Sequence, residues 1–226
     1  MASHSTVASG RPKQAPGPRE AIVAAARRLD ALGLNRGTSG NIGLRTGNSF
    51  LVTPSGVPAE DLTPGAIVEM DFSGAIHGAG KPSSEWRIHR DILVGRADIG
   101  AVVHTHSRYA TSLACLHRDI PPFHYMIALA GGDTIRCAPY AVFGSQALSD
   151  LALKALDDRK ACLLGNHGQI ALGRDLVDAL AMAVEVESLC AQYWTALQLG
   201  QPQLLSSPQM LEVLEKFKGY GRQGQA

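Results

Sequence analysis

Apolar residues recur along this chain with two different periods, and each period predicts one kind of secondary structure. Apolar positions three and four residues apart predict helices over residues 20–34, 86–96, 109–116, 145–157, 176–199 and 208–218. Short apolar runs between Gly, Pro and Asn turns predict strands over residues 42–45, 49–53, 67–71, 100–105, 160–164 and 169–172. The clearest element is the helix over 176–199, which is rich in Ala and Leu and ends at Gly200.

The order of these elements predicts the fold class. Helices and strands alternate irregularly, and we find no internal repeat and no linker that divides the chain. This favours one α/β domain over residues 19–226, with a mixed or mostly antiparallel sheet covered by helices. Residues 1–18 are rich in Ser, Gly and Pro and are expected to form a flexible tail. A doubly wound dinucleotide fold is disfavoured, because no G-x-G-x-x-G follows the first strand.

Composition narrows the function classes. The 226 residues are enough for a sizeable core, and a net charge of +1 gives no case for a nucleic-acid or membrane partner. No apolar stretch reaches the ~18 residues that a membrane span needs. The four cysteines are widely spaced among apolar neighbours, which favours buried reduced thiols and a cytoplasmic protein: Cys115, Cys137, Cys162 and Cys190.

The most informative polar residues are His104, near the end of the predicted strand over 100–105, and His106, directly after it. Side chains two residues apart on a strand point to the same face, with backbones roughly 6–7 Å apart, so both imidazoles can reach one divalent metal ion. The alternative is a strand edge that carries two polar histidines. His167 follows the apolar run 161–164 and offers a third ligand. Three protein ligands leave a position open for substrate, as in catalytic zinc sites.

Three short stretches have the composition of anion-binding loops. Residues 37–41, 53–56 and 82–84 combine small residues with hydroxyl and amide donors, and the third precedes a predicted helix, whose first N–H groups attract anions. Each alone is typical of an ordinary turn, and no P-loop lysine accompanies them. Together with a metal site, they favour a small phosphorylated substrate.

Glu85 stands at the start of the helix over 86–96, directly after Ser83 and Ser84. A carboxylate there can simply interact with the helix dipole. Beside a metal-bound substrate it can also act as a general acid and base. The remaining histidines give weaker signals: His89 is expected to face neighbouring structure, and His124 is undecided.

Taken together, these motifs strongly resemble the class II aldolase/adducin family. The segments PSSEWRIH (82–89), AVVHTH (101–106), HYMIALAGG (124–132), CAPYAVFG (137–144) and the loop with His167 occur in the family's order, and the likeness extends from about residue 19 to 221. Within the family, the chain looks most similar to members that act on L-fuculose 1-phosphate.

The resemblance implies an enzyme with the fold of that family, which cleaves a ketose 1-phosphate to dihydroxyacetone phosphate and a small aldehyde such as lactaldehyde. It implies Zn²⁺ as the cofactor, with Mn²⁺ or Co²⁺ as substitutes, and a homotetramer with active sites at subunit interfaces.

The resemblance also implies roles for particular residues of this sequence. His104, His106 and His167 would bind zinc, and Glu85 would be the acid/base and a zinc ligand when substrate is absent. Tyr125 would reach the aldehyde oxygen, from a neighbouring subunit if the interface arrangement holds. The phosphate and the aldehyde would contact two further sets, namely Asn41, Ser55, Gly56, Ser83 and Ser84 for the phosphate, and Phe143, Phe217 and Tyr220 for the aldehyde.

Several alternatives stay open within this fold. The main one is an aldolase for 5-deoxyribulose or 5-methylthioribulose 1-phosphate, followed by a methylthioribulose-1-phosphate dehydratase. A pentulose-phosphate 4-epimerase is less favoured, because such relatives usually carry Asp at the position of Glu85. A non-catalytic adducin-like module is disfavoured by the presence of all three histidines and Glu85.

Overall fold

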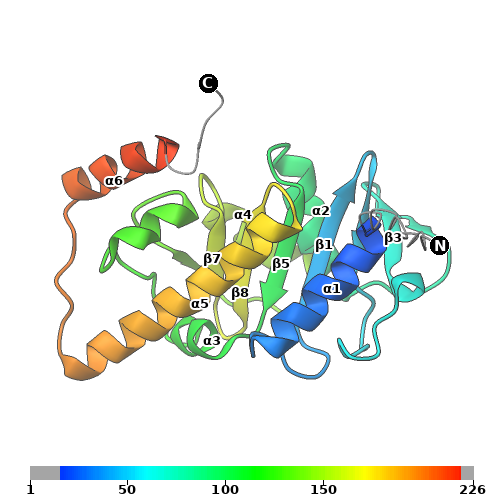
Figure 1. The fold of residues 1–226 in the computed structure, drawn as a ribbon, viewed down its shortest axis with the longest axis horizontal. Helices are drawn as coiled ribbons and strands as arrows, with labels where there is room; N and C mark the ends of the chain where they lie inside the picture. The colour runs from blue at the N-terminus through cyan, green and yellow to red at the C-terminus, as the bar shows by residue number, and fades with distance from the viewer. Residues whose placement is uncertain (1–15, 220–226) are drawn as a thin grey trace, which may run out of the picture.

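The molecule is built on one eight-stranded sheet with helices on both faces, described here from a computed structural model over residues 16–219 (Figure 1). The helices are α1 (Pro18–Ala31), α2 (Trp86–Gly95), α3 (Arg108–Ala114), α4 (Gln146–Ala155), α5 (Leu176–Leu199) and α6 (Ser207–Gly219). Two 3-10 helices join them, η1 (Pro64–Ala66) and η2 (Tyr125–Ala130). The expected tail over 1–18 lies almost wholly outside the described residues.

The strands follow the order β4-β3-β2-β1-β5-β8-β7-β6 across the sheet. All neighbours are antiparallel except β6 and β7. The sheet is therefore mostly antiparallel, and the expected α/β fold class is confirmed. The strand bounds are β1 (Asn41–Thr46), β2 (Ser49–Val52), β3 (Val68–Asp71), β4 (Ile76–His77), β5 (Ala101–Thr105), β6 (Arg136–Ala138), β7 (Ala161–Leu164) and β8 (Gly168–Gly173).

The predicted helices and strands are all present, with ends shifted by no more than a few residues, and α5 has the predicted bounds. Four elements were not predicted: β4, β6, η1 and η2. The first two have only two and three residues, too few to show an alternation. β6 is a strand because it pairs with β7, and this contact is tertiary.

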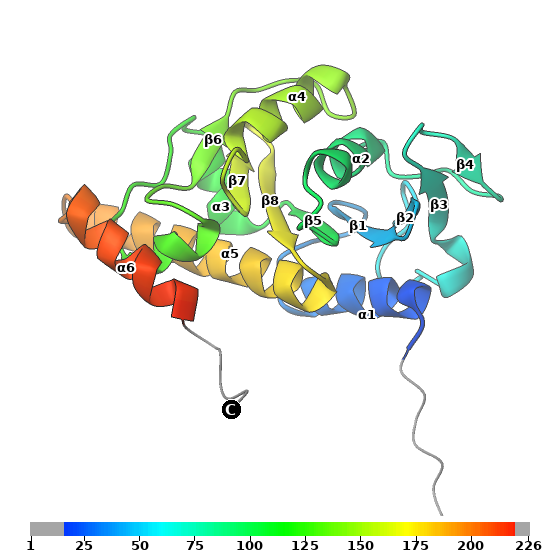
Figure 2. The ribbon, with the colours of Figure 1, turned by 90° about the horizontal axis from the view of Figure 1, so that it is seen from above.

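Side chains of the central strands alternate between two apolar layers. Val102 on β5 packs in the layer beneath α2 and α4, whereas Ala101 and Val103 pack in the layer with α1 and α5. Figure 2 shows α1 and α5 in a row along one face of the sheet, with α2 and α4 on the other. Among the described residues, no helix is both long and apolar enough to cross a membrane.

This topology brings several segments to one end of the sheet. The chain reverses between α2 and β5, so the start of α2 lies beside the end of β5. Asn41, the first residue of β1, is paired with His104 near the end of β5, and β8 begins beside them after the β7–β8 turn. Asn41, Glu85, His104, His106 and His167, which were singled out in the sequence, come from these segments.

Candidate metal centre

Three histidines and one glutamate converge at this end of the sheet. Ligand atoms of Glu85, His104, His106 and His167 all lie within 4.8 Å of one another. The three imidazole centroids are 4.8 Å apart in every pair, and the rings meet edge to face. The arrangement directs several nitrogen and oxygen atoms at a common point, as a metal site requires.

His104 is completely buried near the end of β5. Its Nδ1 lies 2.9 Å from the backbone carbonyl oxygen of Gln169 on β8. Because a carbonyl oxygen only accepts, Nδ1 carries the hydrogen and Nε2 keeps a free lone pair. That Nε2 is 2.9 Å from the His106 Nε2. A backbone partner on the outer nitrogen is the usual support of a metal-binding histidine.

The other two histidines lie just outside regular strands. His106 follows β5, and its backbone N–H donates to the Asn35 side-chain oxygen at 3.2 Å. His167 lies in the β7–β8 turn, directly after Asn166, whose φ of 53° is in the left-handed region that Asn tolerates. The turn brings the His167 Nε2 to 3.3 Å from the Glu85 Oε1.

Glu85 directly precedes α2 and is only 6% exposed. Its Oε2 accepts from the Asn41 side-chain amide at 2.8 Å and lies 3.2 Å from the His104 Nε2. Its Oε1 is buried and has no hydrogen-bond partner. An unsatisfied buried carboxylate oxygen is costly, and a bound cation would remove that cost. The residues therefore fit a metal ion.

Protonation states support this fit. Burial and the neighbouring imidazoles lower the pKa of both His106 and His167 to about 4, so both are neutral near pH 7. Burial alone would raise the pKa of Glu85, but the interaction with His104, the nearby His167 and the hydrogen bond from Asn41 hold it well below its usual range. Burial opposes a charge on His104, yet the Glu85 carboxylate raises its pKa. The neutral imidazoles of His106 and His167 are ready to bind a metal ion, and three histidines with one carboxylate are ligand types found in zinc sites.

The expected anion-binding loops lie beside this cluster. The Ser83 N–H donates to the Thr53 carbonyl at 2.9 Å, and the Ser55 N–H donates to the Lys81 carbonyl at 3.0 Å. A hollow beside β1 is lined by several small polar residues from two of the loops: Gly37, Ser39, Gly40, Asn41 and Thr53. Among the loop residues, Ser83 is buried, Ser55 is half-buried, and Ser84 and Gly56 are exposed. The structure thus brings the three predicted loops together.

The expected aldehyde-site residues lie elsewhere in the chain. Tyr125 on η2 is 50% exposed, and its ring lies against those of His124 and Phe217, the latter on α6. Phe143 is exposed in the segment before α4, and the adjacent Gly144 packs against the Ser84 backbone. Tyr220 lies outside the described residues.

Three residues near the centre were not recognised as functional from the sequence. Gln169 and Asn35 support His104 and His106 as described above. His89 is completely buried, and its Nε2 contacts the Asn41 side-chain oxygen. The only sequence signal for His89 was its spacing of four residues from Glu85, which places both on one face of a helix.

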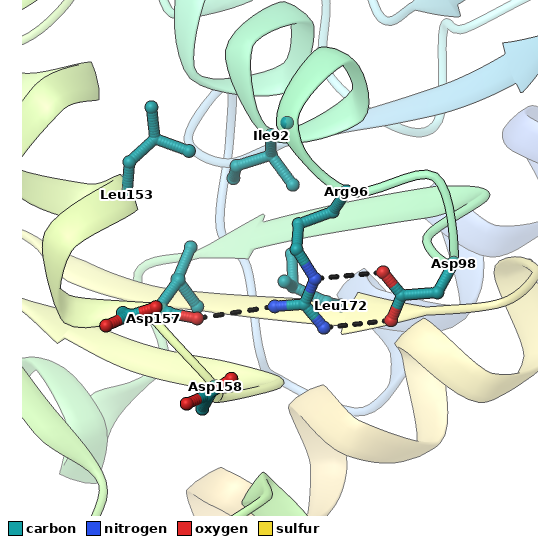
Figure 3. A pocket seen from close by; sticks show the side chains of 9 residues that line it. Ile92, Arg96, Asp98, Leu153, Asp157, Asp158 and Leu172 are labelled. Carbon is teal, nitrogen blue, oxygen red and sulfur yellow. Dashed lines mark hydrogen bonds and ion pairs between the residues drawn. The ribbon is translucent and has the colours of Figure 1, made fainter.

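Two larger hollows are also present, and the first shares Ser39 with the hollow beside β1. One of about 510 Å³ opens beside His106 and offers room for a substrate next to the cluster. It is lined by Gly33, Arg36, Ser39, Arg108, Tyr109 and Glu187. The other, of about 470 Å³, lies at the far end of α2, where Arg96 is paired with Asp98 (Figure 3).

Comparisons with known proteins agree with this geometry. The family model described as the Class II Aldolase and Adducin N-terminal domain matches residues 20–194. A 5-methylthioribulose-1-phosphate/5-deoxyribulose-1-phosphate aldolase of Rhodospirillum rubrum is 54% identical over 207 residues, which cover 92% of this chain and 94% of that protein. The L-fuculose phosphate aldolase of Escherichia coli K12 is 47% identical over 88% of this chain and 94% of its own length.

Solved structures are similar too. A structure of an L-fuculose 1-phosphate aldolase superposes with a TM-score of 0.86 at 37% identity, covering 88% of this chain and 95% of that one. The chain therefore belongs to the class II aldolase and adducin family, as a metal-dependent aldehyde-lyase.

Proposed function

We propose that this aldolase cleaves a five- or six-carbon ketose 1-phosphate into dihydroxyacetone phosphate and a small aldehyde. The observation that carries the proposal is the position of Glu85, which contacts two of the three clustered histidines and directly follows the loop of Ser83 and Ser84. A phosphate held by that loop would leave the adjacent carbons of the substrate beside the carboxylate.

The first candidate substrates are 5-methylthioribulose 1-phosphate and 5-deoxyribulose 1-phosphate. The identity of 54% with the Rhodospirillum rubrum enzyme supports them. L-Fuculose 1-phosphate, the substrate class expected from the sequence, is the second candidate, supported by the 47% identity with the Escherichia coli enzyme. All of them share the phosphorylated ketose end and differ in the aldehyde released.

The residues that would hold the metal are His104, His106 and His167, joined by Glu85 when substrate is absent. Three imidazoles with an open position suit Zn²⁺, and Mn²⁺ or Co²⁺ could substitute. When bound, the ion supplies a Lewis acid for the substrate carbonyl, so no Schiff-base lysine is needed.

The side chains then move protons. In cleavage, the ionised Tyr125 oxygen takes the proton of the C4 hydroxyl while the C3–C4 bond breaks and its electron pair stays with the C3 fragment. Glu85, which is protonated at this stage, gives its proton to C3 and so completes dihydroxyacetone phosphate; exchange with solvent then removes the proton from Tyr125 and returns one to Glu85. In the aldol direction, Glu85 takes the C3 proton and Tyr125 protonates the former aldehyde oxygen.

Tyr125 is proposed to serve the centre of a neighbouring subunit in a homotetramer. Its half-exposed ring on η2, stacked on Phe217, supports a role at a surface that another copy covers. Phe143, Phe217 and Tyr220 would line the aldehyde side of that interface site. Mixing an inactive His106→Ala protein with an inactive Tyr125→Phe protein tests this, because mixed tetramers should regain activity only if the two residues come from different subunits.

The proposed reaction is tested by release of dihydroxyacetone phosphate, measured through NADH oxidation by glycerol-3-phosphate dehydrogenase. 5-Methylthioribulose, 5-deoxyribulose and L-fuculose 1-phosphates are compared, with and without a chelator. We expect chelator-sensitive release with the highest kcat/KM for the first two. If a dehydration product formed instead, with no dihydroxyacetone phosphate from any of the three substrates, the dehydratase would be favoured over the aldolase.

A further inference from the structure

Behind the metal centre, a buried chain of hydrogen bonds leads from α2 to β1 and back to Glu85. His89 lies one helical turn after Glu85 and is completely buried. Its Nε2 contacts the Asn41 side-chain oxygen, and the Asn41 amide nitrogen donates to the Glu85 Oε2 at 2.8 Å. One asparagine therefore joins the histidine to the carboxylate.

Chemistry determines the direction of both bonds. The ionised Glu85 carboxylate can only accept, so Asn41 must turn its NH₂ group toward it. The Asn41 carbonyl oxygen then faces His89, and because this oxygen also only accepts, the His89 Nε2 must carry the hydrogen. The other ring nitrogen, Nδ1, is buried without a hydrogen-bond partner. Only the Nε2–H tautomer makes a hydrogen bond here.

The backbone of β1 is adapted to this imidazole. Gly43 is two residues after Asn41 and therefore faces α2 as well. A Cβ at Gly43 would lie 2.5 Å from the His89 Nδ1 and 2.8 Å from its Cγ, closer than packing allows. The absent side chain is what makes room for the ring. Burial lowers the pKa of His89 to about 3, so the ring stays neutral.

We propose that His89 is a positioning residue that acts through Asn41 to set the direction of the Glu85 carboxylate. With Oε2 held by the amide, Oε1 is the oxygen left without a hydrogen-bond partner, on the side of His167. The same bond orients the Asn41 amide, whose second hydrogen stays available for a phosphate oxygen. The inference rests on the proposed function, in which Glu85 exchanges the C3 proton.

The test uses two substitutions that differ in one donor. His89→Leu removes the hydrogen bond to Asn41, whereas His89→Gln can place an amide N–H near the position of Nε2. Gly43→Ala is an independent variant that displaces the ring without removing it. His77→Leu, at an exposed histidine on β4, is the matched control.

Two readouts do not depend on turnover. Long-range ¹H–¹⁵N NMR of the metal-free protein reports the His89 tautomer, and the visible absorption of the Co²⁺ form reports the ligand field to which Glu85 contributes. We expect the Nε2–H tautomer in wild type, a changed Co²⁺ spectrum in His89→Leu, and a near-wild-type spectrum in His89→Gln. An Nδ1–H tautomer, or a wild-type spectrum in His89→Leu, would overturn the proposal.

The kinetic readout is deuterium exchange at C3 of dihydroxyacetone phosphate, followed by NMR in D₂O. We expect His89→Leu and Gly43→Ala to slow exchange and lower kcat about 10- to 100-fold at unchanged metal content, the usual cost of losing an outer-shell partner. His89→Gln should recover most of the rate. If His89→Leu and His89→Gln lowered kcat and the exchange rate equally, His89 would have only a packing role.

If His89→Leu fails to fold, the comparison of Gly43→Ala with His89→Gln decides the question in the same way. If wild-type protein shows neither exchange nor cleavage, the proposed function fails, while the tautomer and the Co²⁺ spectra still decide the role of His89.

Discussion

The two ends of helix α2 carry ionised groups of very different character. At its start, Glu85 is buried, contacts the imidazoles of His104 and His167 and keeps one oxygen without a hydrogen-bond partner. At its other end, Arg96 donates to both oxygens of Asp98 at 2.9 Å and to the backbone carbonyls of Leu156 and Arg159 (Figure 3 shows the pair with Asp98). The hollow beside Arg96 is nevertheless large, at about 470 Å³.

The comparison teaches that cavity size does not identify the reactive end. Arg96 and Asp98 are partly exposed and form an ion pair with each other. Arg96 also donates to the Leu156 carbonyl, so it joins the end of α2 to the turn after α4. The groups around Glu85 are buried and incompletely satisfied, which costs stability unless a ligand completes them. Ligand sites are therefore found where buried polar groups lack hydrogen-bond partners within the protein itself.

Loss of the metal should have the largest effect on cleavage activity, and it should act only through the groups at the Glu85 end of α2. Chelation or His106→Ala should reduce cleavage below detection, because the remaining side chains supply no Lewis acid. Zinc added back should restore the wild type but not His106→Ala. Metal content by emission spectrometry and activity are measured on the same samples, and full activity in a metal-free sample would contradict the assignment.

Glu85→Gln should have the next largest effect. The amide keeps the size of the side chain but cannot take a proton, so kcat should fall about 10²–10⁴-fold. The three histidines should retain the metal, and KM should change little. Steady-state kinetics with a parallel metal assay check this, and a near-wild-type kcat would exclude Glu85 as the acid/base.

Ser83→Ala sharpens the comparison at the phosphate loop. Loss of one hydrogen bond to a charged group, about 1.5–3 kcal/mol, should raise KM about 10- to 100-fold and leave kcat almost unchanged. Ser73→Ala, in the exposed turn after β3, is the control and should leave KM unchanged. A selective fall in kcat would mean that Ser83 positions Glu85, whose N–H it accepts at 3.3 Å, more than it binds phosphate.

Substitutions at the Arg96 end should affect stability alone and have the smallest effect. Asp98→Asn should lower the free energy of unfolding by no more than about 1 kcal/mol, as for exposed ion pairs. Arg96→Met should cost about 1–3 kcal/mol, because the carbonyls of Leu156 and Arg159 lose a donor. Urea unfolding measures both. A tenfold fall in kcat/KM for Asp98→Asn would contradict the view that the Arg96 end of α2 affects stability alone.

Much of the fold and of the metal site was predictable because local patterns carry it. The alternation around His104 and His106 predicted a shared direction, and the structure puts their Nε2 atoms 2.9 Å apart. The apolar periodicity of α5 predicted its bounds. β6 was missed because its three residues have no pattern of their own and become a strand through β7.

The role of His89 was the main feature beyond reach. A histidine on an apolar helix face can be a packing residue or part of a polar network, and the choice depends on what lies opposite. Here Gly43 leaves space for the ring and Asn41 supplies an acceptor. Neither residue is near His89 in the sequence.

By itself, the sequence determined the elements, the donor types and the histidine pair, since each follows from the identity and spacing of neighbouring residues. Only the tertiary structure decided that Asn41 joins His89 to Glu85, across separations of 48 and 44 residues. It also decided that Arg96 has hydrogen-bond partners, whereas the Glu85 Oε1 has none. The physical reason is that hydrogen-bond satisfaction and burial depend on which strands and helices pack together, and a linear pattern does not specify those partners.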